Sequence, residues 1–123
     1  MSRVIIFMFL LGLVLNIWDA SAATSTEQLV TSCEKRTRHV ERVNGKMEFV
    51  GESLDLFCEA YLISAFELLL SQRAICVKDV TPPPRPEYLA SVLTTYLDSN
   101  RELMKSPAAT VLNEALRRVF VCK

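Results

Sequence analysis

The sequence predicts an all-α protein: a small bundle of four, or four to five, helices that two disulfide bonds hold together, behind an N-terminal signal peptide. Two observations support this fold class. Apolar residues recur at helical spacing through most of residues 23–123. All four cysteines lie in that range, and an even number of cysteines in a short exported chain is typical of a disulfide framework.

Residues 1–22 have the three parts of an export signal. Arg3 gives a short positive start, residues 4–15 form an almost unbroken apolar run, and Ala20-Ser21-Ala22 is a small-x-small cleavage site. The run is shorter than the ~20 apolar residues that cross a bilayer comfortably. We therefore expect cleavage near Ala22 and a single exported domain over residues 23–123, with no membrane segment left after cleavage.

The charge balance narrows the possible partners. Basic and acidic residues number 14 each, so the chain carries no formal net charge. A neutral domain is a poor candidate for nonspecific binding to nucleic acid or to an anionic membrane surface. Neither kind of partner is expected.

Two helices are predicted before residue 71. Residues 24–35 form a short helix, because Thr24 or Ser25 can cap it. Residues 53–70 form the clearest helix, with Ser53 as a possible cap and apolar side chains over more than half of its circumference. A helix so broadly apolar is expected to lie between neighbours, as the central element of the bundle.

Residues 36–51, between these helices, are the least decided part of the chain. Asn44-Gly45 is a strong signal for a β-hairpin when alternating strands flank it. Val40 and Val43, however, do not alternate as a half-buried strand would. The pattern favours a polar loop over a hairpin, and an extension of the first helix into this stretch is a third possibility.

A proline-rich connector follows the central helix over residues 71–86. Each proline lacks an amide donor and restrains the residue before it, so Pro82-Pro83-Pro84-Arg85-Pro86 is expected to be extended and stiff. A rigid spacer that leads into the next helix, with Pro86 in its first turn, is favoured over a PxxP-type ligand.

Two more helices are predicted in the last third of the chain. Residues 87–97 repeat apolar side chains at helical spacing, and residues 98–100 end that helix. Residues 101–105 form a short turn. The last helix begins with Ser106 as its N-cap and Pro107 as its first helical residue, and it carries apolar side chains from Ala108 to Phe120.

The helix order favours one of the three possible cysteine pairings. Cys58 and Cys76 stand near opposite ends of the central helix, roughly 20 Å or more apart, which is too far for a bridge. Helices joined by short loops tend to run antiparallel, which favours Cys33–Cys58 and Cys76–Cys122. A zinc site is disfavoured, because the chain has no C-x-x-C pair and a single histidine, His39.

No catalytic, cofactor-binding or metal-binding residues are predicted. A Cys33–His39 dyad is formally possible, but a bridge would remove the thiol of Cys33. Asp55 and Glu59 lie four residues apart at the start of a helix, where carboxylates usually compensate the helix dipole. With few glycines, no phosphate-binding loop can be written. The chain is therefore expected to bind another molecule and not to act as an enzyme.

Short motifs follow one another in order along the chain from Cys58 to Cys122. They are Cys58-x-Ala60-Tyr61-Leu62, Cys76, Val80-Thr81, Tyr96-Leu97, Pro107-Ala108-Ala109, Ala115-Leu116 and Phe120-Val121-Cys122. This ordered set resembles the Rap/Tai family of type VI secretion immunity proteins. The resemblance covers roughly residues 29–122, nearly all of the chain after the signal peptide. Where the family has glycines or prolines, this chain has Ala60, Ser64, Lys78, Arg101 and Val121.

The resemblance implies a function and a location. Such proteins are helical, are typically dimeric, and lie in the periplasm of Gram-negative bacteria. They block a secreted peptidoglycan amidase by covering its active cleft. The expected partner is thus a cognate amidase toxin, with a homodimer as a second possible assembly and with no cofactor.

Two surfaces are candidates for partner binding. One is the proline connector, with Lys78, Asp79 and Arg85, and the other is the corner after the third helix, with Asn100 and Arg101. Two alternative functions stay open: a periplasmic adaptor or envelope protein of the same fold without a toxin partner, and a small acid-stress chaperone.

Overall fold

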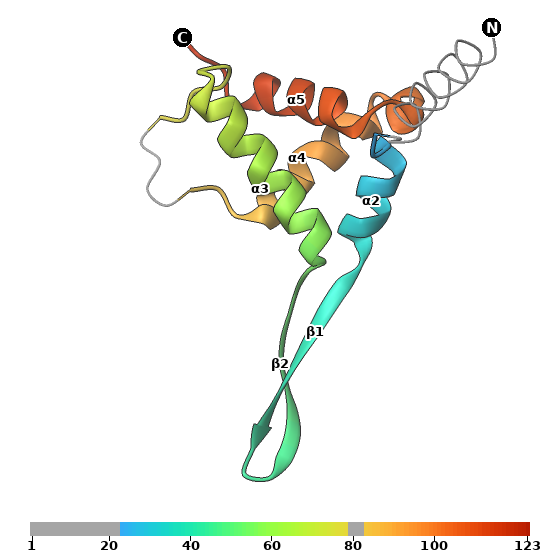
Figure 1. The fold of residues 1–123 in the computed structure, drawn as a ribbon, viewed down its shortest axis with the longest axis vertical. Coiled ribbons are helices and arrows are strands. Elements are labelled where there is room, and N and C mark those ends of the chain that lie inside the picture. The colour runs from blue at the N-terminus through green and yellow to red at the C-terminus, as the bar shows by residue number, and fades with distance from the viewer. Residues whose placement is uncertain (1–22, 79–82) are drawn as a thin grey trace, which may run out of the picture.

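In the part of the chain that the structure describes, four α-helices pack into one body, and a long β-hairpin projects from it (Figure 1). The computed structural model describes residues 23–78 and 83–123, so the predicted signal peptide lies outside the described residues. In chain order the elements are α2 (Thr26–Glu34), β1 (Arg36–Val43), β2 (Lys46–Leu54), α3 (Leu56–Ser71), α4 (Pro86–Asp98), the 3₁₀-helix η1 (Arg101–Lys105) and α5 (Ala108–Val119).

The all-α prediction is wrong, because residues 36–54 form an antiparallel β-hairpin and not a polar loop. The register runs from Arg36 opposite Leu54 to Val43 opposite Lys46. Asn44 and Gly45 form the turn, with φ of 51° and 79°. Positive φ at both central residues defines the type I′ turn, which matches the twist of hairpin strands.

The broken alternation of residues 36–51 has a physical explanation. Alternation is a signature of a sheet with one buried face, and every residue of β1 is exposed. In β2 the first five residues are exposed as well, and only Leu54 at its end is buried. A hairpin whose two faces are both exposed to solvent needs no alternating apolar residues, so its sequence resembles that of a loop.

The hairpin also shifts the start of the central helix. Ser53 and Leu54 complete β2, and α3 begins at Leu56 with Asp55 as its N-cap, so the predicted cap at Ser53 is wrong. The other helices lie close to their predicted ranges. Ser25 caps α2 in a capping box with Gln28.

Pro86 is the first residue of α4, as predicted. For α5, however, Pro107 is itself the N-cap and makes no side-chain cap bond, so the predicted Ser106 cap is wrong by one position. The carbonyl oxygen of Ser106 instead accepts hydrogen bonds from Thr26, from its amide at 2.9 Å and its hydroxyl at 2.8 Å. The start of α2 is thereby attached to the start of α5.

All four α-helices contribute to one core. The fully buried side chains include Leu29 on α2, Leu62 and Leu69 on α3, Leu93 on α4 and Leu116 on α5. The central position predicted for α3 is only partly correct, because one side of this helix faces solvent. Leu56, Phe57 and Leu68 there are 77%, 48% and 57% exposed.

The two disulfides join the pairs that helix order favoured. Cys33–Cys58 connects the end of α2 to the start of α3, with Cα atoms 5.0 Å apart. Cys76–Cys122 connects the segment after α3 to the chain end after α5, with Cα atoms 4.7 Å apart. The amide of Cys76 also donates to the carbonyl oxygen of Phe120 at 3.0 Å. One bridge therefore closes the base of the hairpin, and the other holds the opposite end of the bundle.

Candidate binding surface

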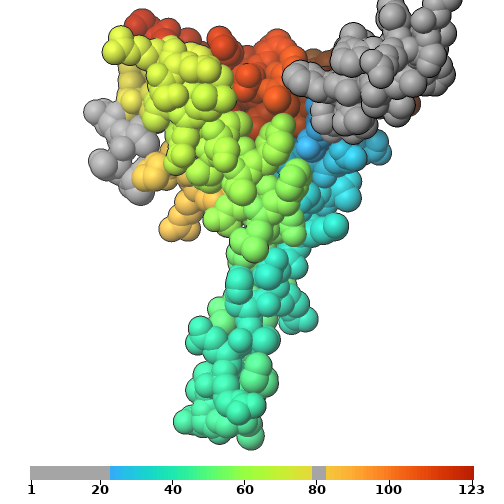
Figure 2. Space-filling view, in the orientation of Figure 1, coloured from blue at the N-terminus to red at the C-terminus, as the bar shows by residue number. Residues whose placement is uncertain are grey.

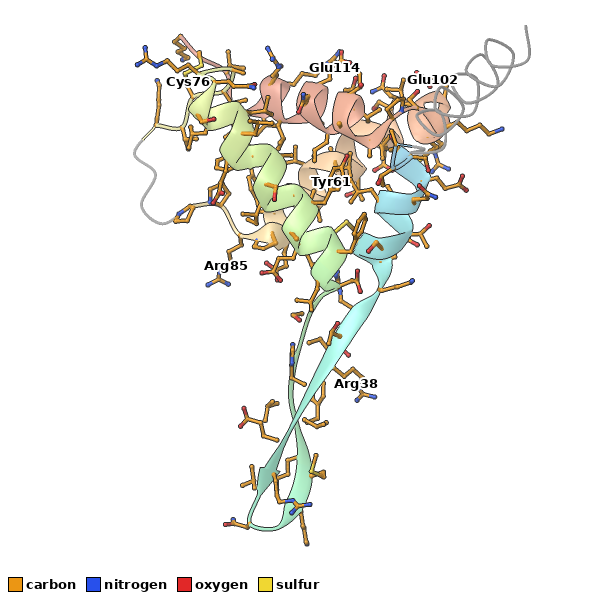
Figure 3. All side chains as sticks on the ribbon, in the orientation of Figure 1. Arg38, Tyr61, Cys76, Arg85, Glu102 and Glu114 are labelled. Carbon is orange, nitrogen blue, oxygen red and sulfur yellow. A yellow bond between two sulfur atoms is a disulfide. The ribbon has the colours of Figure 1, made fainter. Side chains whose placement is uncertain are left out.

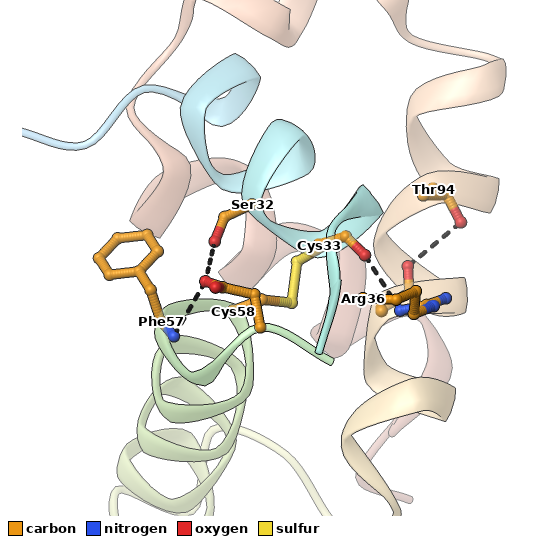
Figure 4. The surroundings of a disulfide bond; sticks show 8 residues. Ser32, Cys33, Arg36, Phe57, Cys58 and Thr94 are labelled. Carbon is orange, nitrogen blue, oxygen red and sulfur yellow. Dashed lines mark hydrogen bonds between the residues drawn. A yellow bond between two sulfur atoms is a disulfide. The ribbon is translucent and has the colours of Figure 1, made fainter. Parts of the chain in front are cut away.

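The base of the hairpin is held by a bridge and a set of hydrogen bonds (Figure 4). Arg36, the first residue of β1, donates from Nη1 to the carbonyl oxygen of Cys33 at 3.2 Å. Across the base, the Ser32 hydroxyl donates to Oδ2 of Asp55 at 2.6 Å. Together with the Cys33–Cys58 bridge, these contacts fix the positions at which β1 and β2 join the helices.

Asp55 has two roles at this base. It caps α3 by accepting the amide of Phe57 at 3.1 Å, and it accepts the hydroxyl of Ser32 from α2. The Ser32 hydrogen bond, with help from the amides of Phe57 and Cys58 and from the charge of Lys35, lowers the pKa of the Asp55 carboxyl below its ordinary value of 3.8, against a weaker opposing effect of burial.

The lowered pKa predicts an acid-dependent loss of stability. A carboxyl with a depressed folded-state pKa stabilises the fold above its unfolded pKa, and the contribution is lost as pH falls through the folded value. We expect the stability advantage of the wild type over Asp55→Asn, in which asparagine can still cap, to shrink between about pH 5 and pH 2. Urea unfolding at several pH values tests this; an advantage that stays constant over the range would contradict it.

The hairpin has two chemically different faces. Residues directly opposite each other in an antiparallel pair share a face, and neighbours along a strand alternate. An extra residue in β2, Val50, shifts the register between His39 and Val40. The register defines a Phe49 face, made of Arg36, Arg38, Val40, Arg42, Met47, Phe49, Glu52 and, buried at its base, Leu54. The opposite, His39 face is made of Thr37, His39, Glu41, Val43, Lys46, Glu48, Gly51 and Ser53.

The Phe49 face presents apolar side chains to solvent between positive charges. Val40 and Phe49 are directly opposite each other and are each 53% exposed, and Met47 beside them is 61% exposed. The guanidinium of Arg38 lies 4.9 Å from the centre of the Phe49 ring, and its Nε lies 3.7 Å from Oε1 of Glu52. Figure 3 places Arg38 on the part of the hairpin that stands clear of the helices.

The His39 face is more polar. Nε2 of His39 on β1 lies 2.7 Å from the hydroxyl oxygen of Ser53 on β2, in a hydrogen bond between the two strands. Glu41 and Glu48 are directly opposite each other closer to the turn. Cys33 is bonded to Cys58, so the dyad of Cys33 and His39 has no free thiol in this structure.

The connector carries the first predicted partner surface. Lys78 and Arg85 are both exposed, and Asp79 lies outside the described residues. Arg85 is the N-cap residue of α4, where its extended backbone precedes Pro86 and its side chain makes no cap bond. Both described side chains are thus available to solvent.

The second predicted surface lies at the other end of α4. Asn100 is half-buried, and its Nδ2 donates to the carbonyl oxygen of Tyr96 at 2.8 Å, which serves to end the helix. Arg101 is exposed. Figure 3 shows Arg85 and Glu102, the neighbour of Arg101, on opposite sides of the helical body. The two predicted surfaces are therefore separate.

A groove of about 420 Å³ runs along the exposed side of α3. Its lining includes Phe57, Ala60, Ser64 and Leu68 of α3 and Ala109 of α5. Burial raises the pKa of Tyr61, which lines the same groove.

The sequence did not predict the hairpin. Its one local signal was Asn44-Gly45, which does form the turn. Space-filling representation shows the hairpin as a narrow projection below the rounded helical body (Figure 2). It is the most protruding described part of the chain in this view.

Comparison with protein-family models, curated proteins and solved structures finds no match to this chain. In residues 23–78 and 83–123, no helix is long and apolar enough to cross a membrane. The same residues hold no group of three or more His, Cys, Asp or Glu side chains arranged to bind a metal ion. The two disulfides indicate an oxidising environment, as is found outside the cytosol.

Proposed function

We propose that this protein is an exported immunity-type inhibitor, which binds a secreted peptidoglycan amidase and covers its active cleft. Its site of action is the periplasm of a Gram-negative bacterium, after signal cleavage near Ala22. The resemblance of the ordered motifs over residues 29–122 to the Rap/Tai family supports this proposal, as does the oxidising environment that the disulfides indicate.

One observation carries the proposal: a hairpin that is exposed on both faces is held at its base by a disulfide. An isolated two-stranded hairpin is marginally stable in water, and packing or a covalent link is needed to order it. Here the bridge, the Arg36 hydrogen bond and the burial of Leu54 fix both ends. A preorganised element loses little conformational entropy on docking.

The shape of the hairpin suits a concave partner. Two strands about 4.8 Å apart form a ribbon much narrower than a helix bundle. A ribbon of this kind can enter a cleft that the helical body is too wide to enter. An enzyme cleft is such a concavity, because active sites bury most of the surface of a substrate.

Co-expression tests the proposal. A peptidoglycan amidase encoded beside this chain is directed to the periplasm, with and without this protein, and lysis of the culture is followed. We expect this protein to restore growth and to bind the purified amidase with nanomolar affinity. Lysis at an undiminished rate, together with no binding, would eliminate the proposed function.

A further inference from the structure

The two faces of the hairpin differ in charge as well as in polarity. On the Phe49 face three arginines stand against Glu52, a formal charge of +2. On the His39 face Lys46 stands against Glu41 and Glu48, a formal charge of −1 with neutral histidine. The neutral composition of the whole chain therefore hides a local separation of charge across one ribbon.

Three exposed apolar residues lie together on the positive face, whereas Val43 lies on the His39 face and Val50 is the extra residue at the register shift. Val40, Met47 and Phe49 occupy two successive cross-strand positions and are each more than half exposed. Aromatic residues, methionine and arginine are the residue types enriched at the centres of protein interfaces. Arg38 is already oriented by Glu52 and by the Phe49 ring, so docking would order few additional side-chain rotamers.

A second copy of this chain does not fit the Phe49 face. Two such faces in contact would bring charges of +2 together, and like charges disfavour the pairing. Contact of the Phe49 face of one molecule with the His39 face of another would be heterologous and would lead to open chains, not to a closed dimer.

A lipid surface fits poorly as well. The end of the hairpin is Asn44-Gly45, which Val43 and Lys46 flank, and Glu41 and Glu48 lie close behind it. An element that enters a bilayer would carry its apolar residues at the tip, whereas Val40 and Phe49 lie along the side of the ribbon. The apolar cluster is thus placed for contact along one face.

From these observations we infer that the Phe49 face is the contact surface, and that it binds a protein cleft with an apolar floor and an acidic rim. This inference rests on the proposed function and assigns roles within it. Phe49 and Val40 cover the floor of the amidase cleft. Arg42, near the tip, meets carboxylates of the rim and speeds association.

Four single substitutions, two on each face, test the inference. Phe49→Ala and Arg42→Glu change the Phe49 face, while Val43→Ala and Lys46→Glu truncate an apolar side chain and reverse a charge on the His39 face next to the turn. All four positions are exposed, so the fold should survive each change. Affinity and association rate for the purified amidase encoded beside this chain are measured at low and high salt.

We expect Phe49→Ala to weaken binding by about 30-fold or more, the effect of losing an interface hot spot. Arg42→Glu should weaken binding by about 10-fold or more, mainly through slower association, and the difference should shrink at high salt. Val43→Ala and Lys46→Glu should stay within about 3-fold of wild type.

Other results would overturn the inference. The Phe49 face is rejected, and the proposed function is kept, by either of two results. One is an equal loss of affinity from substitutions on both faces, and the other is an unchanged affinity of Phe49→Ala when the wild type binds. No binding by the wild type rejects both. Capture of vesicles that contain phosphatidylglycerol, if Phe49→Ala abolishes it, would assign the face to lipid. Self-association that Phe49→Ala abolishes would assign it to a second copy.

Discussion

Removal of the Cys33–Cys58 bridge, by the double substitution Cys33→Ala/Cys58→Ala, is expected to lower the free energy of unfolding by about 3–4 kcal/mol. The bridge spans 25 positions, and its loss frees that loop in the unfolded chain. Both cysteines are buried, so alanine avoids placing an unpaired hydroxyl in the core. Urea unfolding followed by circular dichroism measures the change.

The second bridge provides the matched control. Cys76→Ala/Cys122→Ala opens a loop of 46 positions, and the loss of stability should be similar or slightly larger. Only the first variant should lose the fixed base of the hairpin and, with it, most of the affinity for the amidase. Equal affinities of the two variants would contradict the role that we assign to Cys33–Cys58.

Shortening the hairpin is expected to abolish most of the binding to the amidase while leaving the fold intact. We propose replacing residues 39–51 by Asn-Gly. Arg38 and Glu52, which are directly opposite each other, then flank the new turn, as Val43 and Lys46 flank the present turn. The removed residues bury almost nothing, whereas Leu54 stays in the core. The variant should keep both disulfides and nearly all of its stability, and should lose about 100-fold or more in affinity.

A variant in the connector serves as the comparison for this experiment. Lys78→Ser/Arg85→Ser alters the first surface that the sequence suggested and leaves the hairpin intact. We expect it to protect cells as the wild type does in the co-expression assay. Protection by the shortened hairpin, with loss of protection in the connector variant, would move the binding site to the connector.

The helices and the bridges were predictable from the sequence because their signals are local. Ser25 with Gln28, and Pro86 at a helix start, specify helix ends within a few residues. The bridge pairing followed from helix length and antiparallel order. Helix ends depend on short segments, and the pairing depends on the lengths and order of the helices. Neither requires knowledge of which residues the folded chain buries.

The hairpin was not predictable in the same way. A strand is usually recognised by the apolar face that it buries, and residues 36–53 bury none. What orders them is the bridge at the base, a contact between residues on two different helices. The N-cap of α3 was misplaced for the same reason, since Ser53 belongs to a strand that the pattern did not reveal.

The two faces of the hairpin, which form the candidate site, could not be predicted from the sequence either. The charges of residues 36–54, four basic and three acidic, are interspersed along the chain, and they separate into two faces only when the register is known. The register depends on the turn at Asn44 and Gly45 and on the extra residue at Val50. A register shifted by one residue would place the same side chains on the opposite face.

Hydrogen exchange on the complex with the amidase is the most direct test of the central claim, that this chain binds through its hairpin. In a two-stranded sheet every second amide points away from the partner strand and exchanges readily in the free protein. We predict slower exchange over Arg36–Leu54 in the complex, with exchange near Arg85 and Arg101 unchanged. Slower exchange near those two arginines, with that of the hairpin unchanged, would contradict the account.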